Sequence, residues 1–328
     1  MLRQFFATAA VAATLLGSLA VLPASAQTSD YPSKTIRLIS PFSAGGTNDF
    51  LSRAIARKLE TALGKPVIVE NRTGANGMIG ADFVAKNPGD AHLLFMGNGA
   101  THGSNSTLYP KITYDAVKDF TPVGMLAFVP LVLIVNTALP IKSIPELLAY
   151  SKAHPGSMSF GSSGLGSTAH FTGEKFKQLT GIDLVHIPYK GDAPAVTDVL
   201  GGQLPLAFIS ITSVISHLNS GRMRILAVAN ARRSPSIPDV PTFAEAGIKD
   251  MEFATWYAVM APAGIPKDVV NKLNQEINTA LDSQDMKQSF ATQGAEPTKF
   301  KPEELGAFVI AQIARYARMI KELSIRAE

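Results

Sequence analysis

A short segment rich in glycine and in hydroxyl and amide side chains stands near the start of the chain, between an apolar run and an amphipathic one. It reads Ser-Pro-Phe-Ser-Ala-Gly-Gly-Thr-Asn-Asp over residues 40–49. Gly45 and Gly46 let backbone amides approach a ligand closely, and Thr47 and Asn48 are residue types that cap a helix. The free amides at a helix start carry the positive end of its dipole. The segment therefore favours binding of an anion, although glycines that serve only packing would give the same pattern.

A second segment of this kind lies between a later apolar run and a later helical pattern. It reads Gly-Ser-Ser-Gly-Leu-Gly-Ser-Thr over residues 161–168. A third turn, residues 189–194, adds Lys190, which is either a partner for an anion or a solvated surface charge. Turns of this kind on two facing lobes are what a cleft needs to hold both ends of a small polar ligand.

The second segment also matches part of a nucleotide-binding pattern. Gly164, Gly166 and Ala169 fit GxGxxA, but a dinucleotide site needs an acidic residue at the end of the following strand. The nearest acid, Asp183, precedes that strand instead. We therefore expect no nucleotide, and no other cofactor.

A hydrolase is the alternative from another class of protein. The nucleophile pattern GxSxG is absent because position 165 is leucine. Ser163 or Ser167 with His170 would still supply a nucleophile and a base, so a periplasmic hydrolase stays open, although we expect the protein not to be an enzyme. The six histidines include no HExxH and no pair at ligand spacing, so we expect no metal site.

Alternating β-rich runs and helical periods must position these turns, and they predict two α/β lobes with mostly parallel sheets. In the first lobe we expect strands at 35–39, 67–70, 92–96 and 120–124 and helices at 50–63 and 79–86. In the second we expect strands at 132–135, 158–161, 184–188, 205–209 and 225–229 and helices at 144–153, 167–179, 193–200 and 213–220. A strand at 253–260 and helices at 268–281 and 302–323 return to the first lobe, on which the last helix should pack.

The first residues read as an export signal. Arg3 is followed by an apolar run over residues 5–22 and by the small residues Ala-Ser-Ala at 24–26. We expect a cleaved signal peptide at 1–26 and a periplasmic protein, the alternative being an uncleaved membrane anchor. The mature chain should then divide into lobe 1 at 27–127, lobe 2 at 128–250 and a return to lobe 1 at 251–328.

Composition excludes several classes of function. The 328 residues include no cysteine, so disulfides, thiol catalysis and thiolate metal sites are excluded. The formal charge is +4, spread over many segments, and there is one tryptophan. Nucleic-acid binding therefore lacks both a basic stripe and stacking platforms.

The chain resembles, nearly from end to end, the Bug family, the periplasmic solute-binding proteins of tripartite tricarboxylate transporters. The matching residues are 31–32, 36–38, 41–49, 69–72, 108–109, 119–120, 161–167, 186–191, 238–242, 245–247 and 256–264. The resemblance implies a type II periplasmic-binding-protein fold, in which two α/β lobes are joined by crossing strands around a cleft. It also implies a small carboxylate ligand, membrane permease subunits as partners and, as we expect, a monomer. A ligand-sensing subunit of a membrane signalling system is a further alternative.

The candidate ligand contacts come from both lobes. They are Phe42, Ser43, Ala44, Gly45, Gly46, Thr47, Asn48, Asn98, Ser162, Ser163, Gly166, Ser167, Thr168, Tyr189, Lys190, Ala193 and Ser210. The family often has an aspartate where this chain has Ser210, and that difference weakens the inference of an amino-acid ligand. Residues 88–92 and 97–106 also depart from the family pattern, which suggests a changed rim. The class of ligand is thus implied, and its identity is not.

Overall fold

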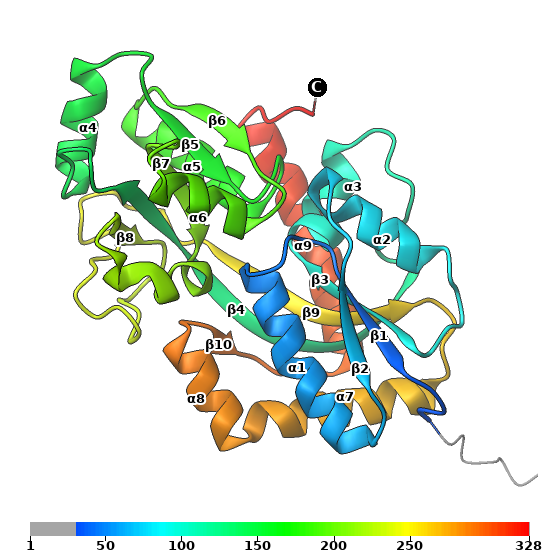
Figure 1. The fold of residues 1–328 in the computed structure, drawn as a ribbon. Helices are drawn as coiled ribbons and strands as arrows, with labels where there is room; N and C mark the ends of the chain where they lie inside the picture. The colour runs from blue at the N-terminus through cyan, green and yellow to red at the C-terminus, as the bar shows by residue number, and fades with distance from the viewer. Residues whose placement is uncertain (1–30, 328) are drawn as a thin grey trace, which may run out of the picture. The chain divides into compact units, whose positions relative to one another are not determined.

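The computed structural model describes residues 31–327, so the signal peptide expected at residues 1–26 lies outside the described residues. The chain divides into Met1–Tyr31 and the compact unit Pro32–Glu328. The second unit contains the strands and helices labelled in Figure 1. Strands and helices alternate through most of it, as expected of an α/β protein.

The first lobe is built on three parallel strands. They are β1 (Ile36–Ser40), β2 (Val67–Asn71) and β3 (Leu93–Asn98), with β1 between the other two. Helices α1 (Thr47–Leu63) and α2 (Met78–Ala85) connect them. Leu51, Ile55 and Leu59 recur at helical spacing in α1 and are fully buried. Gly64 ends this helix in the left-handed conformation, with φ of 67°.

The second lobe repeats this arrangement. Strand β5 (Ser159–Ser162) lies between β6 (Val185–Pro188) and β7 (Leu206–Ser210), and all three are parallel. Helices α5 (Thr168–Thr180) and α6 (Asp192–Leu200) connect them, and α4 (Ile144–Ala153) precedes β5. The parallel pairing expected for each lobe is therefore found within these two groups of strands.

Two long strands cross between the lobes, as Figure 1 shows. They are β4 (Phe120–Asn136) and β9 (Ala254–Pro262), which pair antiparallel from Phe120 to Pro130 of β4. From Leu131 onward β4 pairs instead with β7 and, from Val132, with β8 (Met223–Val228). Strands β1 to β9 thus form one continuous sheet, to which β10 (Glu296–Pro297) adds by pairing with β4.

The separate strands expected at 120–124 and 132–135 are a single strand in the structure. Pro130, which lacks an N–H donor, stands where β4 changes partner, a position at which proline costs the sheet little. The lobe boundaries expected after residues 127 and 250 stay a prediction, since the first of them falls inside this continuous strand.

Other differences from the expected elements are local. The helix expected at 213–220 is instead two 3₁₀ segments, η3 (Ile211–Ser213) and η4 (Ile215–Ser220). This stretch is rich in β-branched residues and serines, which disfavour a regular helix. Sequence periodicity missed η1 (Ala75–Gly77), η2 (Ala100–Ser104), α3 (Asn105–Leu108) and α8 (Gln284–Thr292), which are short.

The last long helices follow β9. They are α7 (Lys267–Asp282) and α9 (Pro302–Glu322). Helix α9 packs on β4 and η2, as expected, but it also reaches the second lobe. There the hydroxyl of Tyr316 lies 2.9 Å from that of Thr168, and Lys175 forms an ion pair with Glu322 at 2.8 Å.

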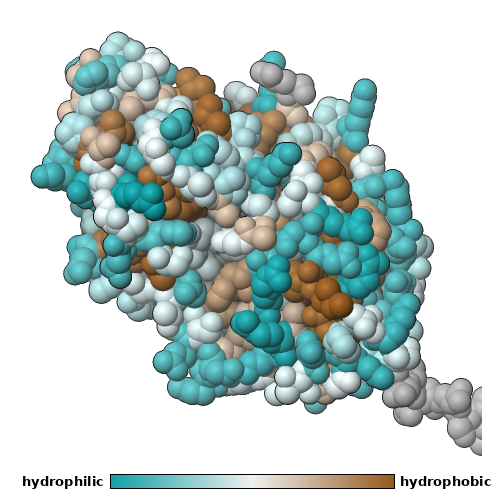
Figure 2. Space-filling model, viewed as in Figure 1, coloured by the Kyte–Doolittle hydropathy of each residue, from teal (hydrophilic) through white to brown (hydrophobic). Residues whose placement is uncertain are grey.

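Each lobe has its own hydrophobic core. The first-lobe core contains Ile39, Phe95, Phe120, Met125, Trp256 and Leu305 among others, and the second-lobe core contains Leu133, Phe160, Phe176, Phe208 and Phe243 among others. Apolar residues in the view of Figure 2 form small patches among polar ones rather than one broad face. The two cores hold the lobes rigid and leave the region between them to polar side chains.

Candidate ligand-binding site

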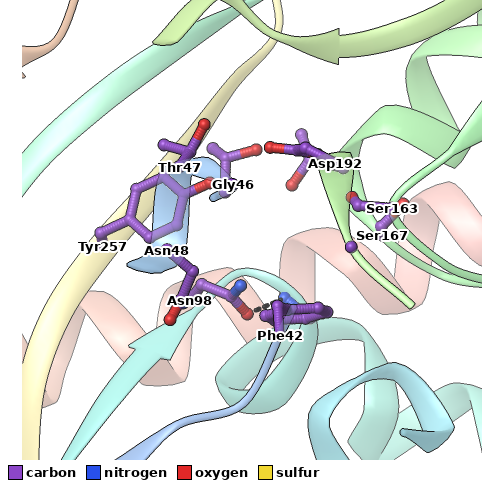
Figure 3. A pocket seen from close by; sticks show the side chains of 13 residues that line it. Phe42, Gly46, Thr47, Asn48, Asn98, Ser163, Ser167, Asp192 and Tyr257 are labelled. Atoms are coloured by element: carbon purple, nitrogen blue, oxygen red, sulfur yellow. Dashed lines mark hydrogen bonds between the residues drawn. The ribbon is translucent and has the colours of Figure 1, made fainter. Parts of the chain in front are cut away.

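A polar cavity lies between the lobes, beside the crossing strands (Figure 3). Figure 3 shows Gly46, Thr47, Asn48 and Tyr257 on one side and Asp192 on the other. The lining residues are Phe42, Gly46, Thr47, Asn48, Asn98, Ala100, Ser163, Ser167, Thr168, Gly191, Asp192, Thr255 and Tyr257. They come from the starts of α1, α5 and α6, from the end of β3 and from β9.

The cavity is narrow because the lobes touch. The centre of a water-sized sphere can occupy about 20 Å³ of it, which is room for about one water molecule. Thr47 N–H donates to Ser213 Oγ at 3.0 Å, and Ser43 N–H donates to the Lys190 carbonyl at 3.1 Å. An organic acid can therefore reach the cavity only when the lobes separate.

The start of α1 differs from the expected cap. Gly46 is the N-cap residue, in an extended conformation, and no side chain caps the helix. Thr47 and Asn48 lie inside the helix instead, so the expectation that they cap it is wrong. The Thr47 hydroxyl lies 2.8 Å from Ser213 Oγ, and the Asn48 side chain accepts from Ser40 Oγ at 2.7 Å. Because neither side chain caps the helix, the amides at its start other than the Thr47 N–H, which bonds to Ser213, are left for the cavity.

The start of α5 is capped by a side chain. Ser167 Oγ accepts from the His170 N–H at 3.2 Å, and the ring Nδ1 of His170 accepts from the Gly166 N–H at 3.1 Å. Burial lowers the pKa of His170 to about 2, helped by the neighbouring His186 and Lys177. Within the described part of the chain, the His170 ring makes no hydrogen bond to Ser163 or Ser167. The hydrolase alternative gains no support from this geometry.

Asp192, the first residue of α6, is a buried acid of the cavity that sequence reasoning missed. Its side chain faces Gly46 in Figure 3, and the residue is 6 % exposed. Ser213 Oγ donates to its Oδ2 at 3.0 Å. Burial raises its pKa, and hydrogen bonds from the hydroxyls of Ser213, Thr47, Ser210 and Ser163 oppose the shift. Asp192 lies within the turn at 189–194, but an acid does not fit a site expected to bind an anion.

The crossing strand β9 supplies a second group that was missed. Thr255 and Tyr257 lie on one face of the strand, because side chains alternate along it, and both line the cavity. The Tyr257 hydroxyl lies 3.4 Å from Ser210 Oγ, and burial raises the pKa of Tyr257 well above its usual value. The period of two could have predicted the shared face, although it could not show that this face borders the cleft.

The segment 97–106, expected to alter the rim, has two separate roles. Asn98 and Ala100 line the cavity, and Asn98 Oδ1 accepts from the Ala100 N–H at 3.0 Å. His102 is instead completely buried, with its ring 4.5 Å from that of Phe120. It is therefore a core residue of the first lobe.

A second, outer pocket of about 190 Å³ adjoins the cavity and shares Phe42 and Ser163 with it. Tyr189 and Lys190, both candidate contacts, line this outer pocket. The remaining lining residues are Gly74, Ala75, Asn76, Gly77, Tyr109, Gly164, Leu165 and Pro188. The cleft thus has an inner polar end and an outer end that carries a lysine.

The candidate contacts fall into three groups. Eight of them line the inner cavity, namely Phe42, Gly46, Thr47, Asn48, Asn98, Ser163, Ser167 and Thr168. Tyr189 and Lys190 line only the outer pocket. The structure places the others behind the walls or at the surface, namely Ser43, Ala44, Gly45, Ser162, Gly166, Ala193 and Ser210.

The third group supports the walls of the cleft. Ser162 Oγ lies 2.6 Å from the ring Nε2 of His186, and Ser210 contacts Tyr257 and Asp192. Ala44 and Gly45 are exposed. Among residues 31–327, no three His, Asp or Glu side chains gather closely enough to hold a metal ion.

Two α/β lobes around a polar cavity, joined by crossing strands, define the chain as a solute-binding protein. A sequence profile described as "Tripartite tricarboxylate transporter family receptor" matches residues 51–325. The chain therefore belongs to this family.

Full-length relatives share both sequence and fold. The chain is 40 % identical to protein BugT of Bordetella pertussis over 97 % of its own length and 94 % of that protein's. The solved structure of R. palustris Rpa4515 with adipate superposes with a TM-score of 0.87 at 36 % identity, over 90 % of this chain and 99 % of that one. The structure of MatC from Rhodopseudomonas palustris with bound malate superposes with a TM-score of 0.83 at 31 % identity, over 88 % of this chain and 100 % of that one.

Proposed function

We propose that this chain is a periplasmic receptor that binds a small carboxylate between its lobes and delivers it to the permease subunits of a tripartite transporter. One observation carries the proposal most directly. The N-termini of α1, α5 and α6 converge on one cavity between the lobes. Each helix start carries the positive end of a dipole, which attracts an anion, and the starts of α1 and α6 have no side-chain cap.

The proposed contacts divide between the ends of the cleft. The amides at Gly46 and Asn48 would hold the carboxylate, since the Thr47 N–H bonds to Ser213 in the closed form. Ser163, Ser167 and Thr168 offer hydroxyls from the other lobe. The rest of the ligand would extend toward the outer pocket, where Lys190 can meet a second anionic group. Two relatives named above were solved with adipate and malate, which are dicarboxylates, and this supports the assignment.

Closure of the lobes would follow binding. The lobes are joined by β4 and β9, so a small change in the twist of two strands can open the cleft. Hydrogen bonds such as that from Thr47 N–H to Ser213 Oγ then hold the closed form around the ligand. Closure shields the ligand from water and gives the permease a shape that reports occupancy.

Delivery to a membrane partner and export to the periplasm belong to the same proposal. Within residues 31–327, no helix has both the length and the apolar character needed to cross a bilayer. A leader cleaved after residue 26 would release the receptor into the periplasm. Intact-mass measurement of the exported protein tests the cleavage.

A thermal-shift screen of the purified chain tests the binding step. Mono-, di- and tricarboxylates, aromatic acids and their uncharged amides would be compared at equal concentration. At least one acid should raise the melting temperature while its amide does not, because a ligand that binds only the folded form stabilises it. If no acid raises it, the assignment is wrong.

Uptake by cells tests the delivery step. Accumulation of the radiolabelled acid should require both the receptor and its permease, and deletion of the permease should abolish it. Normal uptake without the permease, together with a lost transcriptional response without the receptor, would point instead to a sensing subunit.

A further inference from the structure

Resting on the proposed function, we infer that Asp192 is the residue that selects the ligand, and that it accepts a hydrogen bond from a cationic nitrogen. The ligand is then an amino acid or a related zwitterion. Its carboxylate would lie at the start of α1, and its ammonium group would lie between that carboxylate and Asp192.

The position of Asp192 fits this role. It stands across the cavity from Gly46, where a Cβ atom would lie 3.6 Å from the Asp192 Cβ and 3.6 Å from the Ala193 nitrogen. Any ligand held by the first amides of α1 must therefore lie beside this carboxyl group. Two carboxylates enclosed together repel one another unless a proton or a cation lies between them.

Asp192 lacks a cationic partner within the protein. The ion pairs among the described residues join Lys, Arg and His side chains to other acids, and none of these pairs includes Asp192. Its recorded partners are hydroxyl groups. A buried carboxylate without a counter-ion is costly, and a ligand that brings a positive charge removes this cost.

The hydrogen bonds around Asp192 favour its ionised form and oppose the effect of burial, which raises its pKa. Ser213 Oγ accepts from Thr47 N–H at 3.0 Å, so its own proton is left to donate to Asp192 Oδ2 at 3.0 Å. Other groups near the carboxyl, on Ser163, Ser210 and Thr47, are hydroxyls that do not titrate in the physiological range. An acceptor arranged in this way selects a donor on the ligand.

Calorimetric titration with matched acids tests the inference on the wild-type protein at pH 7.5. Each series keeps one carbon skeleton and changes one group: succinate, malate and aspartate; glutarate, 2-hydroxyglutarate and glutamate; 3-phenylpropionate, phenyllactate and phenylalanine; propionate, lactate and alanine. In a series that binds, the amino acid should bind at least ten times more tightly than the plain acid, with the hydroxy acid between them.

Two variants assign the preference to its residue. Asp192→Asn keeps the size of the side chain and removes its charge, so the preference for the amino acid should disappear. Asp183→Asn, which removes an exposed carboxylate of the same lobe, is the matched control and should keep it. Circular dichroism checks that both variants fold. If Asp192→Asn does not fold, the titrations of the wild-type protein alone decide whether an amino acid is preferred.

These experiments distinguish failure of the inference about Asp192 from failure of the proposed carboxylate receptor. If a plain or hydroxy acid binds at least as tightly as the amino acid in every series that binds, the inference is overturned and the carboxylate receptor stands. The same holds if Asp192→Asn keeps the preference. If no acid of any series binds, the proposed function itself fails.

Discussion

Ser213 of the second lobe joins the start of α1 to the carboxyl group of Asp192. Its Oγ accepts from the Thr47 N–H at 3.0 Å and donates to Asp192 Oδ2 at 3.0 Å. One hydroxyl thus links the closure of the lobes to the charged group of the cavity. Ligand chemistry and lobe closure therefore depend on the same few atoms.

Replacing Ser213 with alanine should weaken both lobe closure and ligand binding. Thr47 N–H loses its acceptor and Asp192 loses a donor, and each lost hydrogen bond costs about 1 kcal/mol, or roughly a factor of five in affinity. Calorimetry with the best acid should show a dissociation constant about five to thirty times higher. An unchanged constant would mean that the Ser213 contacts do not form in the bound state.

Gly191→Ala should hinder closure. Gly191 has φ of +128°, and an added Cβ would lie 2.6 Å from Ser43 Oγ in the other lobe. Affinity for the ligand should fall at least tenfold, and small-angle scattering should show no compaction when the acid is added.

Gly181→Ala is a control for a positive φ without a contact between the lobes. Gly181 also has positive φ, +69°, but an added Cβ meets no atom within 4 Å. This variant should lose about 1 kcal/mol of stability and keep wild-type affinity. Equal loss of affinity in both variants would show that strain, and not contact between the lobes, is the cause.

Tyr316→Phe should loosen the contact between α9 and the cavity wall. The buried Tyr316 hydroxyl lies 2.9 Å from Thr168 Oγ1, and both residues are nearly inaccessible to solvent. Removal of one partner should lower the free energy of unfolding by about 1 to 2 kcal/mol in urea titrations. No loss would indicate that water replaces the hydroxyl.

Three buried histidines should make the protein less stable in acid. Burial lowers the pKa of His102 to about 3, of His170 to about 2 and of His186 to about 4. In the unfolded chain the three histidines take up protons near pH 6.5, whereas in the folded protein they stay neutral at that pH. The contribution to stability is therefore full above pH 6.5 and falls below it. At pH 5 each histidine lowers the free energy of unfolding by up to about 2 kcal/mol.

Urea unfolding at pH 7.5 and pH 5 measures this effect. His170→Gln and His186→Gln should each reduce the difference in unfolding free energy between the two pH values. Asp192 acts in the opposite direction, since its raised pKa stabilises the folded form as pH falls. A protein equally stable at both pH values would contradict the assignment of neutral buried histidines.

The sequence predicted the fold well because the relevant signals are local and periodic. The spacing of Leu51, Ile55 and Leu59 identified α1, and the glycine-rich turns at its start and before α5 marked the cleft. The helix predicted at 213–220 was wrong because short stretches of β-branched residues carry no clear period. The single strand β4 was predicted as two strands because a proline inside an apolar run indicates a break. Pro130 instead stands where β4 changes its pairing partner from β9 to β7.

The site was predicted less completely, for a physical reason. Glycine and hydroxyl patterns indicate where amides are free, but they do not show which side chains the fold turns inward. Asp192 and Tyr257 line the cavity because the fold brings α6, β9 and the start of α1, which are distant in sequence, to the same cavity. His102 shows the reverse case, since a histidine expected near the rim lies in the core.

The most direct test of the account compares two substitutions at Gly46 by calorimetry with the acid that most stabilises the protein. A Cβ at Gly46 meets its nearest neighbours at 3.6 Å, so alanine fits the closed cleft, whereas the branches of valine would cover the amides of α1. We predict that Gly46→Ala stays within about fivefold of the wild-type constant and that Gly46→Val, with an unchanged melting temperature, binds at least a hundredfold more weakly, a difference of about 2.7 kcal/mol. Wild-type affinity in Gly46→Val would contradict a carboxylate site at the start of α1.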